Sequence, residues 1–245
     1  MGKVITGEID RIMPLGLTAE EAQAWYRANV LMPALRKGSI AAAIASLIIL
    51  AMYTPISVFS EANLAAHLVV QYFVFILAGF VYAYGIALML LVASRLSKRV
   101  SRMRDLFQRI NSVTNRRGIL AFAFAALLTA YWYIPKNFNA AVLAGGSQLE
   151  MYVTLLIAGM LMFIGSTMLT KRMRQIAPVV AGKAMGLYGM FLLVTTLNLY
   201  PEYPIGQQSD VGILLLLIMV VIDFTVVPVW LYNYFAKGAS QPDFS

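Results

Sequence analysis

The chain has 245 residues, of which 60% are hydrophobic and only 12% are charged, and its mean hydropathy is +0.75. A soluble domain of this size could not cover so much apolar surface, because a globular exterior needs far more charge. The net charge of +8 indicates attraction to anionic lipid rather than to nucleic acid, and the absence of cysteine excludes disulfides, thiolate metal ligands and iron–sulfur clusters.

Residues 1–37 are of mixed polarity and predict a cytoplasmic segment ahead of the membrane domain. Thr18 and Glu21 have the three-residue spacing of a capping box, which predicts the start of a helix. Apolar and aromatic residues then recur at helical spacing, so we expect an amphipathic helix over 18–36 that docks on the membrane surface.

Six apolar stretches follow, and at 1.5 Å per residue they are long enough to cross a hydrocarbon core of about 30 Å. They predict an all-α, polytopic membrane helix bundle at 38–235, followed by a cytoplasmic tail at 236–245. The expected spans are 38–58, 63–94, 118–134, 151–170, 176–200 and 211–235. Short loops are expected between them on the outer side, at 59–62, 135–150 and 201–210.

The basic residues gather on one side of these spans. Of the 19 Lys and Arg residues, all except Lys136 lie on the side that holds both termini. Because basic segments stay in the cytoplasm, this pattern predicts a multi-pass protein of the cytoplasmic membrane with both termini inside.

Span two continues into a basic segment, 95–117, whose apolar residues keep helical spacing. We expect the helix to run on, or to bend, along the cytoplasmic surface, where its Lys and Arg residues would contact anionic lipid. The alternative is a surface on which a partner protein docks.

Charged residues inside a span are costly, so each is a functional hypothesis by default. Asp223 lies within the last span. Lys183 of span five would be its partner if the two helices touch, and would otherwise snorkel to the interface. The two interpretations are a structural polar contact and a proton or ion relay. Gly182, Gly186 and Gly189 form a small-residue face that predicts close packing of span five.

A second set of polar residues is expected at the outer ends of three spans. They are His67, Gln71, Gln148, Tyr152, Gln207, Gln208 and Asp210. Imidazole, amide and carboxylate groups can coordinate a metal, and a methionine thioether suits Cu(I). The candidate metal ligands are therefore His67, Met151, Gln148 and Asp210. The competing interpretation is a group of hydrogen-bonded structural side chains around the lone histidine.

Short motifs within 63–235 resemble the CtaG-type membrane proteins, which are linked to cytochrome oxidase assembly and copper delivery. The stretch 66–71 resembles the helix in which that family carries two histidines four residues apart. The other similar stretches are Trp132-Tyr133-Ile134-Pro135, Asn139 to Leu143, Gln148 to Phe163, and Gln207 to Gly212.

Most of the histidines of that family pattern are replaced in this chain. Gln71, Tyr133, Gln148 and Tyr152 stand at those positions, and only His67 remains. The resemblance implies the helical scaffold and the neighbourhood of a respiratory or copper-containing complex, without carrying over copper transfer.

Three functions follow from these observations. The first is a non-enzymatic accessory or assembly subunit of a membrane redox complex. The second is a transient copper-handling protein that uses the outer His/Met/Gln/Asp pocket. The third is a small proton or ion transporter centred on Asp223. An enzyme is not expected, because the chain has no nucleophile elbow, HExxH motif or P-loop.

Overall fold

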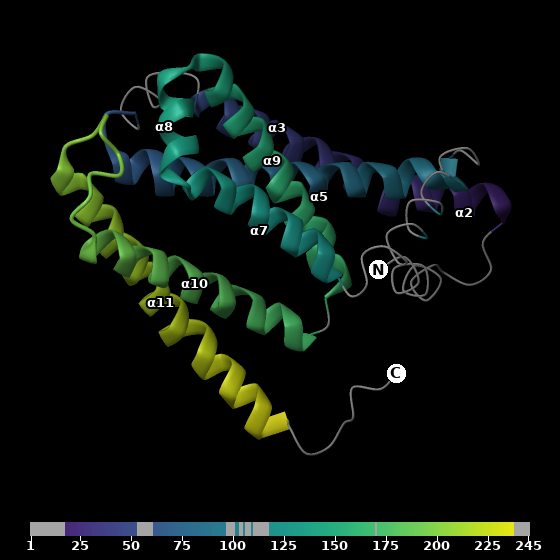
Figure 1. Cartoon of the computed structure of the whole chain (residues 1–245). Helices are drawn as coiled ribbons and strands as arrows, with labels where there is room; N and C mark the ends of the chain where they lie inside the picture. The colour runs from purple at the N-terminus through teal and green to yellow at the C-terminus, as the bar shows by residue number, and fades with distance from the viewer. Residues whose placement is uncertain are drawn as a thin grey trace. The chain divides into compact units, whose positions relative to one another are not determined.

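The computed structural model describes residues 18–52, 61–96, 101–102, 105, 109, 118–169 and 171–237, and in these ranges the regular structure is helical. The helices carry the labels of Figure 1. Their order is α2 (Ala19–Tyr26), η1 (Arg27–Leu31), α3 (Met32–Met52), η2 (Ala66–Gln71), α5 (Tyr72–Leu96), α7 (Ile119–Tyr133), α8 (Pro135–Leu143), α9 (Gly145–Met168), α10 (Lys171–Val194) and α11 (Ile205–Lys237).

Five described helices are long and apolar enough to cross a membrane, and a bent pair would make a sixth span. The five are Ala24–Ala51, Ala66–Leu90, Gly146–Met168, Ile176–Val194 and Ile205–Val229. Large apolar side chains cover their surfaces, for example Leu187, which is 69% exposed, and Phe224, which is 77% exposed. Such a surface needs lipid around it, so the chain is a multi-pass membrane protein.

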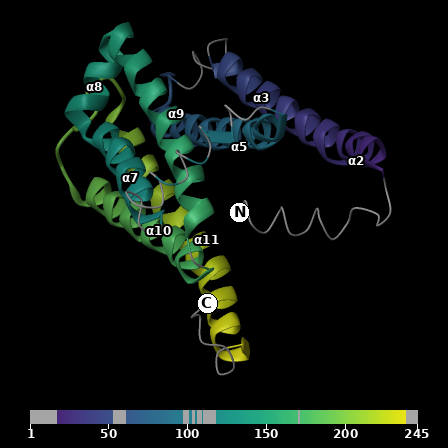
Figure 2. The same cartoon turned by 90° about the vertical axis from the view of Figure 1, so that its right-hand side faces the viewer.

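The predicted capping box is present at the start of α2. The Thr18 amide donates to Glu21 Oε2 at 2.8 Å, and the Glu21 amide donates to Thr18 Oγ1 at 3.4 Å. Helix then continues through α2, η1 and α3 without a loop, and Figure 2 shows α2 running into α3. The apolar stretch begins at Ala24, so the surface helix and the first span are one helix rather than two.

The start of α2 is expected to loosen at low pH. Hydrogen bonds from the Thr18 amide and hydroxyl lower the pKa of Glu21. A lowered pKa in the folded state means that the stabilisation is present above the usual carboxyl range and is lost as pH falls through the folded value. Amide hydrogen exchange over 19–26 should therefore speed up on acidification. A Glu21→Gln variant should lose most of that pH dependence, and an unchanged dependence would contradict the capping role.

The predicted loop at 135–150 is wrong, because α8 and the first turns of α9 occupy it. Pro135 stands at the first turn of α8, and Ile134 before it has an extended backbone (φ −68°, ψ 120°). A residue before proline avoids the helical region, so α7 ends at Tyr133. The third expected span is consequently a helix of 15 residues bent by 69° against α8.

Other helix ends also differ from the predicted span limits. Helix α9 begins at Gly145 rather than near 151, α10 ends at Val194 rather than near 200, and α11 begins at Ile205 rather than near 211. Polar residues before the apolar runs of α9 and α11 are helical, because a helix does not need apolar residues in its first turns. The turn expected around Pro201 and Pro204 is present just before α11.

The chain divides into two compact units by its contacts. Unit 1 comprises 1–50, 76–126 and 156–168, and unit 2 comprises 51–75, 127–155 and 169–245.

Small residues dominate the buried positions of unit 1. Ala45, Ala78, Ala125 and Ala158 have no exposed surface. Reciprocal glycines let helix backbones touch: a Cβ on Gly159 would lie 2.0 Å from the Ile76 carbonyl oxygen, and one on Gly79 would lie 2.0 Å from that of Leu156. Helices α5 and α9 therefore cross at a distance that only glycine permits.

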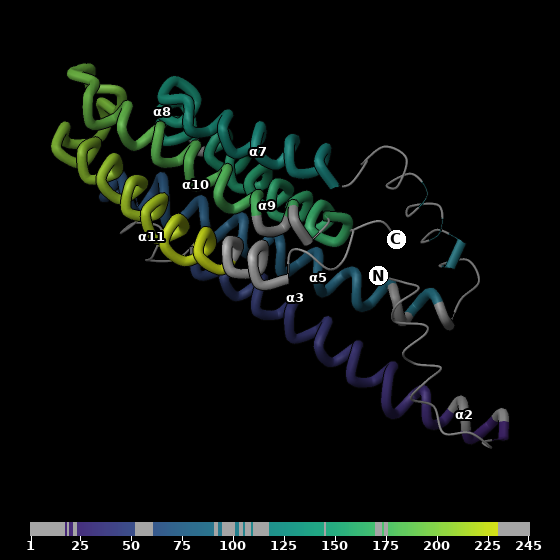
Figure 3. Tube along the Cα trace, turned by 90° about the horizontal axis from the view of Figure 1, so that it is seen from below, coloured from purple at the N-terminus to yellow at the C-terminus, as the bar shows by residue number. Residues whose placement is uncertain are grey.

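In unit 2, helices α10 and α11 run side by side (Figure 3). The predicted glycine face lies at their contact. Gly182 meets Ile222, Gly186 meets Met219, and Gly189 meets the Gly212 carbonyl. The remaining core of unit 2 is rich in aromatic side chains, unlike that of unit 1.

Most of the basic segment 95–117 lies outside the described residues. Helix α5 ends at Leu96, and Ser101, Arg102, Asp105 and Arg109 are helical. Its contact with anionic lipid stays a prediction.

Candidate functional site

The first candidate site is built on the short π-helix η2. Asn63 caps the helical turn that leads into η2, because Asn63 Oδ1 accepts the Ala66 amide at 3.0 Å, and Gln207 Oε1 accepts the Leu64 amide at 2.8 Å. A π-turn is wider than an α-turn, and such turns are frequent at functional sites. His67 and Gln71, one turn apart, are both completely buried.

One imidazole nitrogen of His67 has a protein partner. Its Nδ1 lies 2.7 Å from Tyr203 Oη, and the ring meets Phe138 edge-on at a centroid distance of 4.9 Å. Burial and the charge of Glu61 raise the pKa of Tyr203, so its hydroxyl stays protonated near neutral pH. His67 Nε2 is buried with no hydrogen-bond partner among the described residues.

The amide of Gln71 starts a hydrogen-bonded series that leads away from His67. Gln71 Nε2 donates to Tyr152 Oη at 2.7 Å, and Gln148 Nε2 lies 2.8 Å from both Tyr152 Oη and Glu61 Oε1. The Tyr152 ring stacks on Phe75 with centroids 4.4 Å apart. Gln71 Oε1, like His67 Nε2, is buried without a hydrogen-bond partner in the described structure.

A group of tyrosines satisfies the carbonyls freed where α7 ends. Tyr72 Oη donates to the Trp132 carbonyl at 3.0 Å, and Tyr188 Oη donates to the Tyr133 carbonyl at 2.7 Å. Asn137 Nδ2 donates to the Tyr131 carbonyl at 2.9 Å. The last carbonyls of any helix lack helical partners, and in lipid each unsatisfied one is costly. The helix break at Pro135 therefore accounts for the hydrogen bonds that these side chains make.

Gln208 likewise satisfies backbone groups that lack a helical partner, here after the end of α10. Its Nε2 donates to the Leu197 carbonyl at 3.1 Å, and its Oε1 accepts the Leu199 amide at 3.0 Å. It is 3% exposed, and it closes the turn that joins α10 to α11. Gln208 is a structural residue of that turn.

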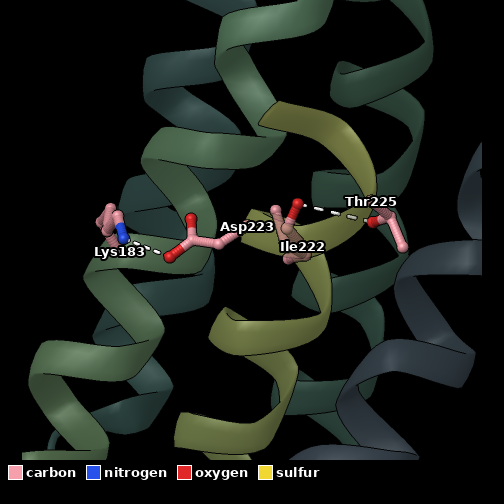
Figure 4. Close-up of polar contacts among 4 residues, drawn as sticks. All are labelled: Lys183, Ile222, Asp223 and Thr225. Atoms are coloured by element: carbon pink, nitrogen blue, oxygen red, sulfur yellow. Dashed lines mark hydrogen bonds and ion pairs between the residues drawn. The ribbon is translucent and has the colours of Figure 1, made fainter. Parts of the chain in front are cut away.

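The second candidate site is an ion pair between α10 and α11. Lys183 Nζ contacts Asp223 Oδ2, and the side chains are 53% and 26% exposed, respectively (Figure 4). Lys183 follows Gly182 and Asp223 follows Ile222, so the pair stands beside the close contact of the two helices. Thr225 does not join the pair, because its hydroxyl donates to backbone carbonyls of its own helix, those of Val221 at 2.6 Å and Ile222 at 3.4 Å.

Within the part of the chain that the structure describes, no hydrogen bond or ion pair joins the predicted metal ligands to one another. Met151 is buried, and its Sδ lies 3.3 Å from Tyr72 Oη. Gln148 is partly buried and bound to Glu61 and Tyr152, and Asp210 is exposed. Within the described ranges, no group of three or more His, Asp or Glu side chains could hold a metal ion. The copper site stays a prediction.

Sequence reasoning missed the residues that surround His67 and the end of α7. They are Tyr72, Phe138, Tyr188, Tyr200 and Tyr203. The one usable signal was the break itself: a proline after an apolar span frees carbonyls that need donors, and tyrosine is a donor that lipid-facing helices tolerate. Which tyrosines supply the donors depends on tertiary structure.

No protein-family model, curated protein or solved structure matches this chain.

Proposed function

We propose that this protein is a non-enzymatic subunit that associates with another membrane protein inside the bilayer, across the face that carries Lys183 and Asp223. The observation that carries the proposal is the half-exposed ion pair on an otherwise apolar helix pair. For the complex to which this subunit belongs, the CtaG-like motifs favour a respiratory or copper-containing redox complex, in which the protein has an accessory or assembly role.

The ion pair lies well inside the spans. Lys183 is seven residues from Ile176 and Asp223 is six residues from Val229, which places each roughly 10 Å from that end at 1.5 Å per residue. Leu187, one turn from Lys183, is 69% exposed, and Phe224, next to Asp223, is 77% exposed. The pair is therefore set in a surface made for apolar contact.

Charged groups at such a depth face a cavity, a partner or each other. Pairing lowers the cost of both charges, but the Lys183 ammonium has three N–H donors, and its contact with Asp223 engages only one of them on a side chain that is 53% exposed. A helix of another protein that offers a polar or acidic side chain at this depth would satisfy them. The partner's chemistry is thus a membrane span with a complementary polar group.

Photo-cross-linking in intact membranes tests this proposal. A photoreactive residue at Leu187 should give a discrete cross-linked product with a second protein. The same residue at Leu127, which is 65% exposed on α7, serves as a lipid-facing control and should give none. The absence of a cross-linked product at both positions would contradict the proposal. A product made of two identical chains would contradict it as well, because the partner would then be a second copy of this protein.

A copper-handling function is the second candidate, and the unpartnered Nε2 of His67 favours it. Metal analysis of purified protein after incubation with Cu(I) should then show bound copper that a His67→Ala variant loses. Negligible copper in both proteins would end this alternative. A transporter centred on Asp223 has no comparable support, because that carboxylate is already paired with Lys183.

A further inference from the structure

The hydrogen bonds of the first site form two series that stop at neighbouring positions of η2. One runs from Glu61 through Gln148 and Tyr152 to the amide nitrogen of Gln71. The other joins Tyr203 to Nδ1 of His67. Each series ends in a buried atom that has no partner in the described structure: Gln71 Oε1 in the first, His67 Nε2 in the second.

Leaving both atoms unsatisfied would be expensive. An unmade hydrogen bond on a buried polar group costs about 1–3 kcal/mol, and two such groups on adjacent turns of one short helix call for a shared partner. His67 and Gln71 are four residues apart on a π-helix, whose wide turn places two such residues on nearly the same face of the helix, one above the other. The partner must therefore be small enough to lie between two side chains of the same helix face.

The chemistry of the two atoms narrows the partner further. If Tyr203 donates to Nδ1, then Nε2 carries the proton and Gln71 Oε1 is an acceptor, so the partner needs one acceptor and one donor. If Nδ1 donates to Tyr203, then both atoms are acceptors and the partner needs two donors. Water meets either demand without a change of protonation state, whereas a metal ion fits only the second.

We propose that His67 Nε2 and Gln71 Oε1 hold one buried water molecule between them. Buried waters typically bond to two to four otherwise unsatisfied polar groups, and this site offers at least two. The water joins the two series into one hydrogen-bonded chain from Glu61 to Tyr203. The chain ties η2 to α9 and to the turn before α11.

This chain is a structural tie rather than a proton path. Gln71 and Gln148 interrupt it, because an amide nitrogen that donates a proton in a hydrogen bond does not readily pass that proton on. The tie explains why amides and phenols suffice at these positions: each is neutral, and each supplies a donor and an acceptor inside the membrane protein.

The single histidine of the chain makes the test direct. In protein labelled with ¹⁵N-histidine, both imidazole nitrogens give unique NMR signals, and magnetisation exchange with water reports a water at Nε2. We expect a water contact at Nε2 in the wild type and its loss in Gln71→Leu. A Gln148→Leu variant makes the same chemical change at another residue of the hydrogen-bonded series and should keep the water contact at Nε2.

The Nδ1 signal serves as the internal check of folding, because its bond to Tyr203 does not involve the proposed water. If Gln71→Leu loses that signal as well, Gln71→Met is the less disruptive replacement and should remove the water contact alone. The absence of a water contact in the wild type, or a contact that survives loss of the Gln71 amide in a folded variant, overturns the proposal. A large Nε2 shift on addition of Cu(I), without a prior water contact, points instead to a metal ligand.

Discussion

A Gly159→Ala variant is expected to lose about 3 kcal/mol of unfolding free energy, a large effect for one methyl group. The added Cβ would lie 2.0 Å from the Ile76 carbonyl oxygen and 2.9 Å from the Phe80 amide nitrogen. Both are backbone atoms of α5, which cannot rotate away as a side chain can. The helices must separate, and the contacts around the crossing are lost with them. Reversible unfolding in bicelles measures the difference.

Two further substitutions serve as matched controls. A Cβ on Gly146, in the same helix α9, meets nothing within 4 Å, so Gly146→Ala should be neutral or stabilising by up to about 1 kcal/mol. A Cβ on Gly182 meets Ile222 Cδ1 at 3.1 Å, the end of a flexible side chain, so Gly182→Ala should cost about 1 kcal/mol or less. Equal stabilities for Gly159→Ala and Gly146→Ala would contradict the close crossing of α5 and α9.

The second large effect is expected from breaking the Lys183–Asp223 pair on one side only. Lys183→Met leaves an unpaired carboxylate and Asp223→Leu leaves an unpaired ammonium within a span. A surface pair in water is worth only about 0–1 kcal/mol, but an uncompensated charge in a bilayer costs about 2.5–3.5 kcal/mol. Each single variant should therefore lose about 2–3 kcal/mol, measured by unfolding in bicelles.

The double variant Lys183→Met/Asp223→Leu removes both charges and should be within about 1 kcal/mol of the wild type, because two apolar side chains suit lipid. The sum of the two single losses would then exceed the double loss by several kcal/mol. Additive losses would show that the two charges do not depend on each other. The double variant also gives a folded protein without the polar face.

The class of this protein follows from composition, because 60% hydrophobic residues and long apolar runs allow few alternatives. The glycine face of α10 and the possible contact of Lys183 with Asp223 were also predictable, since small residues at helical spacing indicate a helix contact and a charge in a span needs a partner. Both depend on local spacing and on one general energetic rule.

The structure of the region from Ile134 to Gly145 could not be predicted from local spacing. Hydropathy predicts a loop after a span of normal length, yet Pro135 breaks the helix early and starts α8. The consequences are tertiary: Tyr72 and Tyr188 come from other helices to satisfy the freed carbonyls. Neither partner could be predicted without the positions of α5 and α10.

His67 illustrates a different limit. The sequence showed a lone histidine one turn from Gln71, which fits a hydrogen-bonded structural group better than a metal ligand. The structure adds that Nδ1 is engaged by Tyr203 while Nε2 is not, and that distinction between the two nitrogens directs the experiment.

The most direct measurement for the proposed association is quantitative co-purification after mild solubilisation, comparing the wild type with Lys183→Met/Asp223→Leu. We expect the wild type to retain a second membrane protein in constant proportion, and the folded double variant to lose it. Retention of the same partner by the double variant, or isolation of the wild type only as a free monomer, would contradict it.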